Sequence, residues 1–126
     1  MIGYAFIGTN DLESSLAFWD KVSAALGGKR LMQVPKKRGW FYGNGQGAML
    51  AVATPYDEAD ATCGNGVMVA LACETPDAVD AAYKAAIDAG AEGDGEPGWR
   101  LPDVFYGAYF RDPGGNKICV YKMNMG

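Results

Sequence analysis

The segment YFRDPGGNKICVY, which runs from Tyr109 to Tyr121, places two strand-like runs on either side of a tight turn. The turn, residues 112–116, contains a proline that fixes φ and two glycines that permit positive φ. Its first and last residues, an aspartate and an asparagine, can bond to nearby backbone groups. The segment therefore predicts a hairpin, and the hairpin fixes where Cys119 lies on the strand that follows.

Outward from this hairpin, the chain repeats one order of elements twice. The first half predicts a strand, a helix and three strands at residues 2–8, 9–28, 29–34, 39–43 and 47–53. The second half predicts the same order at residues 66–74, 75–91, 91–101, 105–111 and 117–123, in which the segment 91–101 is a weak, glycine-rich strand. Residues 54–65 are polar and rich in turn formers, which is typical of a linker.

The two helices are predicted from apolar spacing and from their caps. Asn10 or Asp11 can cap the first helix, and Thr75 followed by Pro76 can begin the second. Apolar residues recur on one face of each helix at a period near that of an α-helix. These residues are Leu12, Leu16, Trp19, Val22 and Leu26 in the first helix, and Val79, Ala82, Tyr83, Ala86 and Ile87 in the second.

Two βαβββ modules predict an α+β fold. We expect one domain over residues 1–126, with module one at 1–53, the linker at 54–65 and module two at 66–126. The two modules can pair into a curled mixed sheet around a shared cleft, with each helix covering the outer face of its own sheet. A ferredoxin-like α+β sandwich is the alternative, and the second tight hairpin in each half favours the paired modules.

The net charge and the amino-acid composition argue against several classes of function. The net charge of −4 disfavours nucleic acid as a partner, because phosphates attract Lys and Arg. The one basic cluster, Lys36-Lys37-Arg38, indicates a solvated turn, with a specific anion site as the alternative. The chain contains no histidine, which removes Ser-His-Asp and Cys-His machinery and the commonest metal ligand.

The sequence favours a cytoplasmic protein. No apolar run approaches the ~20 residues of a membrane span, so we expect no membrane partner. The start, MIGYAFIG, is too short and too uncharged for a signal peptide. The chain has three cysteines, Cys63, Cys73 and Cys119. Their number is odd and their spacing does not match a disulfide framework, so we expect reduced thiols.

Three segments resemble the vicinal oxygen chelate superfamily, which includes glyoxalase I, bleomycin-resistance proteins, fosfomycin-resistance enzymes and extradiol dioxygenases. Residues 2–22 resemble its opening strand and helix, and residues 66–91 resemble the start of its second module. The closing segment YGAYFRDPGGNKICVY resembles its last hairpin, which in relatives often reads D-P-x-G-N-x-I-E. The order is correct and the match spans nearly the whole chain, closest to the small glyoxalase-like bacterial proteins.

The resemblance also implies a divalent metal site, and this chain departs from it. Relatives commonly hold the metal by a His on the first strand, a His on the fifth and the Glu of the last hairpin. These positions fall on Tyr4, Met68 and Cys119, and the internal repeat adds a residue near Met49. Such a set suits soft Cu(I) at best, so we expect neither a metal nor another cofactor. We expect these four residues to line or fill an uncharged cleft.

Aromatic residues are abundant where the cleft is expected. Alternation along a strand puts Trp40 and Tyr42 on one face and Phe41 on the other. Tyr106 and Tyr109 fall in the matching part of module two, and Arg100 lies in a stretch that resembles the loop above the cleft. For each aromatic the core is the other possibility, and for Arg100 it is the solvated surface. The predicted ligand-binding residues are Tyr4, Trp40, Met49, Met68, Arg100, Tyr106, Tyr109 and Cys119.

Three functions remain open from the sequence. The first is a protein that binds a small, aromatic organic molecule without a catalytic metal, and for it we predict no catalytic residues. The alternative is a glyoxalase-like lyase or dioxygenase-type enzyme, either with a non-standard metal or metal-free through Tyr4 or Cys119. The third is a structural partner subunit. We expect a homodimer, because relatives commonly pair and open sheet edges need protection.

Overall fold

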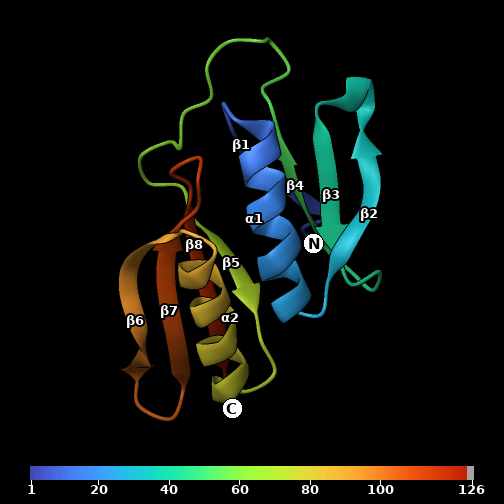
Figure 1. Ribbon diagram of the computed structural model, residues 1–126. Coiled ribbons are helices and arrows are strands. Elements are labelled where there is room, and N and C mark those ends of the chain that lie inside the picture. Colours follow the sequence, from blue (N-terminus) through green and yellow to red (C-terminus); the bar gives the residue numbers. More distant parts are fainter. Residues whose placement is uncertain (125–126) are drawn as a thin grey trace.

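The computed structural model describes residues 1–124; Met125 and Gly126, the end of the predicted second module, lie outside the described residues. Figure 1 shows two helices in front of two sheets. The first half contains β1 (Tyr4–Gly8), α1 (Leu12–Ala25), β2 (Lys29–Val34), the 3-10 turn η1 (Pro35–Lys37), β3 (Gly39–Gly43) and β4 (Met49–Ala53). The second half contains β5 (Val69–Ala72), α2 (Pro76–Asp88), β6 (Glu92–Leu101), β7 (Phe105–Arg111) and β8 (Lys117–Met123).

Each half folds into a four-stranded sheet of the same topology. The strand orders are β1-β4-β3-β2 and β5-β8-β7-β6. In the first sheet β1 pairs in parallel with β4, and in the second sheet β5 pairs in parallel with β8. All other neighbouring strands are antiparallel. This confirms the predicted α+β fold with two βαβββ modules. The two sheets share no strand within the described chain, so the expected curled sheet consists of two separate halves.

The helices begin where the sequence predicts. The side chain of Asp11 accepts a hydrogen bond from the backbone N–H of Ser14, so Asp11 rather than Asn10 caps α1. Thr75 caps α2 in the same way through the N–H of Ala78. These caps fix where each helix starts relative to the strand before it.

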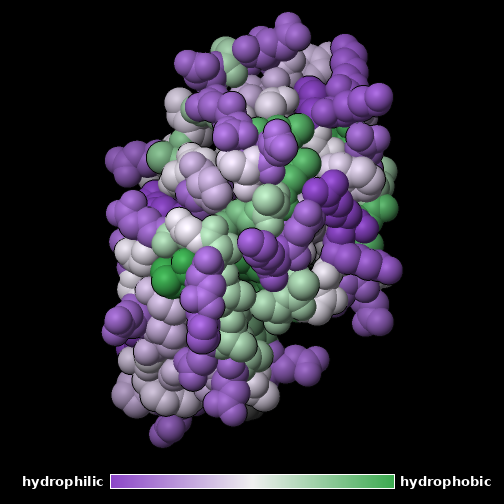
Figure 2. Space-filling view, viewed as in Figure 1, coloured by the Kyte–Doolittle hydropathy of each residue, from purple (hydrophilic) through white to green (hydrophobic). Residues whose placement is uncertain are grey.

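The main core lies between the helices and the sheets. It contains Phe18, Trp19 and Val22 of α1, Val79, Ala82 and Ala86 of α2, and the helix-facing residues of both sheets. Each helix packs on its own sheet as predicted, and α1 also packs against α2. Figure 2 shows hydrophobic residues still visible where the two helices meet, bordered by hydrophilic ones. The modules are therefore joined largely through their helices.

The turn at residues 112–116 ties distant parts of the chain together. Asp112 is buried, and its Oδ1 accepts hydrogen bonds from the backbone N–H groups of Gly114 and Asn116. Its Oδ2 accepts one from Nε1 of Trp19 at 3.0 Å. The Asn116 amide donates to the carbonyl oxygen of Gly8 at 2.9 Å. The predicted hairpin thus also links β1 and α1 to the second module.

Neither helix among residues 1–124 has the length and apolar character needed to cross a bilayer.

Candidate functional site

Each sheet has a helix-facing side and a second side, called here its open face. In the first sheet, Ile7, Tyr42 and Leu50 point to the helix core. Side chains alternate along a strand, so their neighbours point the other way. A second, smaller core of Val34, Phe41, Ala51 and Ala53, with Met49 packed against it, lies on this open face.

Three aromatic rings cluster on the open face of the first sheet. Tyr4 and Phe41 meet edge to face with their ring centroids 5.2 Å apart. Phe6 lies 5.8 Å from each of them. Tyr4 is 56% exposed and Phe6 is 47% exposed. These large apolar side chains present a continuous ring surface to solvent, which is typical of a binding surface.

The open face of the second sheet centres on Tyr109. The Arg100 guanidinium lies 5.4 Å from the centroid of the Tyr109 ring, and the Lys117 ammonium lies 5.6 Å from it. Lys117 is also 3.7 Å from Asp94. Further along the same face, the rings of Phe105 and Tyr121 stack with centroids 5.4 Å apart. This face therefore combines flat rings with two cations.

Six of the eight predicted site residues lie on or beside the open faces. Tyr4 and Met49 are register partners on β1 and β4. Tyr109 and Cys119 are register partners on β7 and β8, and Arg100 lies over Tyr109. Met68, just before β5, is exposed, while the next residue packs against the helix core. Tyr4 and Met49 therefore belong to the first sheet, and the other four residues lie on or beside the second sheet.

Trp40 and Tyr106 do not join them, because both lie on the helix-facing side. Trp40 is the register partner of Val52, packs against the main core and carries the Arg30 guanidinium 5.3 Å from its ring. The Tyr106 hydroxyl donates to Asp80 of α2 at 2.6 Å, and this bond raises the pKa of Tyr106. Strand alternation predicted the pairing of Trp40 with Tyr42 correctly, but not which face the helix covers.

Cys119 is a buried thiol. Its exposed fraction is 0%, and burial raises its pKa above the usual value. A thiol is nucleophilic as its thiolate, so a raised pKa weakens it at neutral pH. Cys119 therefore fits a filling residue buried beneath the open face better than a reacting group.

The residues present do not fit the divalent metal that the family resemblance implies. The four positions offer a phenol, two thioethers and one thiol whose pKa is raised, and none of these is a good ligand for a hard divalent ion. They are also divided between two sheets. Among residues 1–124 no group of three or more Cys, Asp or Glu side chains is arranged to hold a metal ion.

Sequence reasoning missed Phe6, Phe41 and Lys117. Phe6 follows Tyr4 by two residues on β1, so alternation alone could have placed it on the same face. Phe41 was separated from Trp40 but assigned to no site. Lys117 directly follows the predicted turn and lies two residues from Cys119, which was the available signal.

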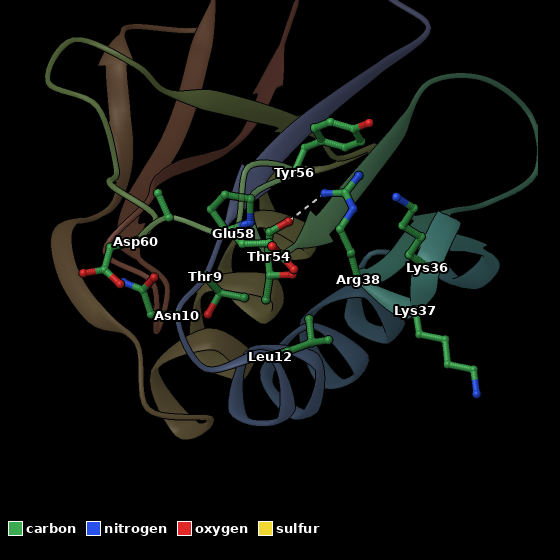
Figure 3. A pocket seen from close by; sticks show the side chains of 12 residues that line it. Thr9, Asn10, Leu12, Lys36, Lys37, Arg38, Thr54, Tyr56, Glu58 and Asp60 are labelled. Atoms are coloured by element: carbon green, nitrogen blue, oxygen red, sulfur yellow. Dashed lines mark hydrogen bonds between the residues drawn. The ribbon is translucent and has the colours of Figure 1, made fainter.

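Two cavities lie away from the open face of the second sheet, beneath the linker of residues 54–65. The larger, of about 690 Å³, has Thr9, Arg38 and Tyr56 among its walls. The smaller, of about 530 Å³, shares Arg38 and Tyr56 and reaches Phe6. Figure 3 shows the larger cavity and the side chains around it. The predicted binding residues are absent from both walls, although the smaller cavity adjoins the open face of the first sheet through Phe6.

Comparisons with known proteins fit this architecture. Residues 1–120 match the model of the family described as Glyoxalase/Bleomycin resistance protein/Dioxygenase superfamily. The structure is similar to that of a glyoxalase/bleomycin resistance protein from Albidiferax ferrireducens. The two chains are 36% identical over 98% of this chain and 99% of that chain, with a TM-score of 0.87.

More distant structures share the fold. A glyoxalase-related enzyme from Fulvimarina pelagi is 18% identical over 97% of this chain and 87% of that chain, with a TM-score of 0.75. A lactoylglutathione lyase from Agrobacterium tumefaciens is 21% identical over 97% of this chain and 92% of that chain, with a TM-score of 0.68. No curated protein matches this chain.

Proposed function

Because this chain belongs to the Glyoxalase/Bleomycin resistance protein/Dioxygenase superfamily, we propose that it binds a small organic molecule on its open sheet faces without a catalytic metal. The observation that carries this proposal is the pair of open faces. One presents the exposed rings of Tyr4 and Phe6, and the other presents Tyr109 between two cations. The preferred ligand has a flat aromatic ring and an acidic group.

The chemistry of the second open face supports this ligand class. An aromatic ring of the ligand can stack on Tyr109 or on the planar Arg100 guanidinium. A carboxylate can bond to Arg100 or to Lys117. Lys117 already lies near Asp94, so Arg100 is the better carboxylate partner. The rings of Tyr4, Phe6 and Phe41 offer apolar contact area, and within residues 1–124 no cation lies over any of them.

We also propose that two copies of the chain pair to complete the cleft. Tyr4 and Met49 lie on the first sheet, and Met68, Tyr109 and Cys119 lie on or beside the second. A cleft walled by both open faces then forms when the first sheet of one protomer meets the second sheet of its partner. The exposure of large apolar residues on both faces supports such a contact, because isolated chains rarely leave such surfaces to water.

A catalytic role without a metal is less well supported. Of the two groups considered, Tyr4 and Cys119, the thiol would have to react as a thiolate, and burial raises the pKa of Cys119. The cysteines Cys63, Cys73 and Cys119 are all unpaired, which suits a reducing compartment, so we propose the cytoplasm as the location.

Titration with benzoate tests the binding proposal. We expect saturable binding to wild-type protein, and a loss of about tenfold in affinity for Arg100→Gln, as expected when a charge-assisted hydrogen bond is removed. Arg30→Gln is the matched control, because Arg30 also lies over an aromatic ring but on the helix-facing side. Cyclohexanecarboxylate, which keeps the acid and lacks the aromatic ring, should bind more weakly.

Two results would contradict the proposal. One is the absence of saturable benzoate binding at millimolar concentrations. The other is an equal loss of affinity in the Arg100 and Arg30 variants, because that would show a general charge effect rather than a site on the open face.

A further inference from the structure

The cavity beneath the linker has a cationic side. Figure 3 shows Lys36 and Arg38 on one side of it and Asn10 and Asp60 on the other, while the far end of Lys37, which also lines the cavity, points away from them. The Lys36 ammonium lies 5.8 Å from the centroid of the Tyr56 ring, and the Arg38 guanidinium lies 5.3 Å from it. Both cations therefore lie beside the same aromatic ring.

These cations are not neutralised by the protein. The ion pairs found among residues 1–124 join Arg30 to Asp20, Lys84 to Asp88, and Arg111 and Lys117 to Asp94. None of them includes Lys36 or Arg38, although Glu58 and Asp60 line the same cavity. Two unpaired like charges beside one ring repel each other, so an added anion would relieve that repulsion.

The backbone fixes this arrangement. Nη1 of Arg38 donates to the carbonyl oxygen of Thr54 at 2.7 Å, and the Thr54 N–H donates to the Arg38 carbonyl at 2.9 Å. Lys36 and Lys37 have φ angles of 64° and 56°, in the left-handed region that is unfavourable for residues with a side chain. Non-glycine residues persist in this region where the surrounding structure enforces it, and they cluster at binding sites.

We propose that this cavity binds a phosphomonoester, with the phosphate between Lys36 and Arg38. A phosphomonoester carries nearly two negative charges at neutral pH and has three acceptor oxygens. It therefore matches two cations, whereas a single carboxylate would neutralise one of them. This site is separate from the open sheet faces and goes beyond the proposed function.

The rest of the cavity suits a small hydroxylated body on the phosphate. Its volume of about 690 Å³ falls within the usual range of small-molecule sites. Glu58 and Asp60 line the cavity and can accept hydrogen bonds from hydroxyl groups, and the negative charge of Asp60 disfavours the phosphate on the side away from Lys36 and Arg38. The Asn10 side chain bonds to the backbone of Ala61 in both directions, which fastens the linker over the cavity.

Titration with glycerol 1-phosphate, followed by backbone amide NMR shifts, tests the proposal. We expect saturable shifts at residues 36–38, 54 and 56–60 and a weakening of about tenfold for Lys36→Gln and for Arg38→Gln. Lys37→Gln is the matched control, because it removes the same charge from the same turn. Lys37 also lines the cavity, but its ammonium end points away from Lys36 and Arg38. Lys21→Gln, on the exposed side of α1, controls for net charge. Both controls should change the affinity by about twofold or less.

Inorganic phosphate and glycerate separate the possible ligands. Glycerate should bind more weakly than the phosphomonoester, and inorganic phosphate should bind without reaching the acidic side. Equal affinity for inorganic phosphate and the ester would show that free phosphate is the ligand and would overturn the ester. Equal losses in Lys36→Gln and Lys37→Gln, or shifts confined to the open sheet faces, would overturn the site. If Arg38→Gln lowers the melting temperature, Lys36→Gln still provides the test, because Lys36 makes no bond to Thr54.

Discussion

At the scale of single residues, Asp112 contributes more to the fold than its place in a turn suggests. Its two oxygens accept bonds from Trp19, from two turn amides and from the Asn116 side chain. We expect Asp112→Ala to lower the free energy of unfolding by about 3 kcal/mol, because several buried donors would lose their acceptor. Urea unfolding measures the change.

Asp88→Ala is the control for that substitution. Asp88 forms an exposed ion pair with Lys84, so its removal should lower the free energy of unfolding by about 0.5 kcal/mol or less. A loss at Asp112 no larger than the loss at Asp88 would show that the turn holds without its carboxylate.

The family resemblance singled out Tyr4 and Cys119, and both lie on the open faces, as Tyr109 does. Strand alternation groups residues by face but does not say which face is open. Trp40 and Tyr106 could not be placed, because the face that a helix covers depends on packing between elements far apart in sequence. The same limit hid the cavity beneath the linker, whose walls come from several separate segments.

At the scale of elements, strands and helices follow from local sequence, and the exception depends on a contact with a distant segment. The turn signals, caps and apolar stripes in the sequence predicted α1, α2 and the strands β1 to β8 close to their observed positions. The sequence did not reveal the 3-10 turn η1, because its two left-handed lysines are residues that rarely adopt that conformation. Its shape depends on the contacts between Arg38 and Thr54.

The start of β3 requires a glycine. A Cβ atom at Gly39 would lie 1.9 Å from the carbonyl oxygen of Val52 and 2.8 Å from the Cβ of Ala53. We expect Gly39→Ala to lower the free energy of unfolding by about 3 kcal/mol or more, because β3 and β4 would have to separate there. A thermal melt measures this loss.

Gly47→Ala is the matched control, since a Cβ atom at Gly47 would meet nothing within 4 Å. We expect it to change stability by about 0.5 kcal/mol or less. Equal melting temperatures for the two variants would mean that the close approach of β3 and β4 is not required.

The contact between α1 and the first sheet depends on pH. Arg30 bonds to Asp20 at 2.8 Å and lowers its pKa, and the Tyr42 hydroxyl also donates to Asp20. A carboxyl whose pKa is lower in the folded state stabilises the fold above its unfolded pKa, near 3.8. That stability disappears as the pH falls through the lower folded value.

Asp20→Asn should therefore be less stable than wild type near neutral pH, and the difference should vanish in acid. Because the pair is partly exposed, we expect a difference of about 1 kcal/mol or less. Urea unfolding from about pH 6 to about pH 2 measures it. A gap between the two proteins that stays constant over this range would show that Asp20 does not titrate with folding.

At the scale of the whole molecule, the two modules present their open faces separately. The described chain joins them through the helices and through the turn at residues 112–116, not through a continuous sheet. The positions that resemble the family's metal ligands are divided in the same way, with Tyr4 on one sheet and Met68 and Cys119 with the other. The cleft can take these three positions from one chain or from two paired chains. The two arrangements predict different results when metal ligands are restored at these positions.

Restoring the ligands in separate chains distinguishes these two arrangements. One chain carries Tyr4→His, and another carries Met68→His together with Cys119→Glu, so neither alone has two imidazoles and a carboxylate. We expect a mixture of the two, after unfolding and refolding together, to melt at a higher temperature in the presence of Zn²⁺ than either chain alone, because the metal stabilises the state that binds it. The triple variant is the positive control, and a mixture of wild type with the double variant is the negative control. If the triple variant gains stability from Zn²⁺ and the mixture does not, the cleft belongs to a single chain. If the triple variant gains nothing, the three positions do not converge in either arrangement.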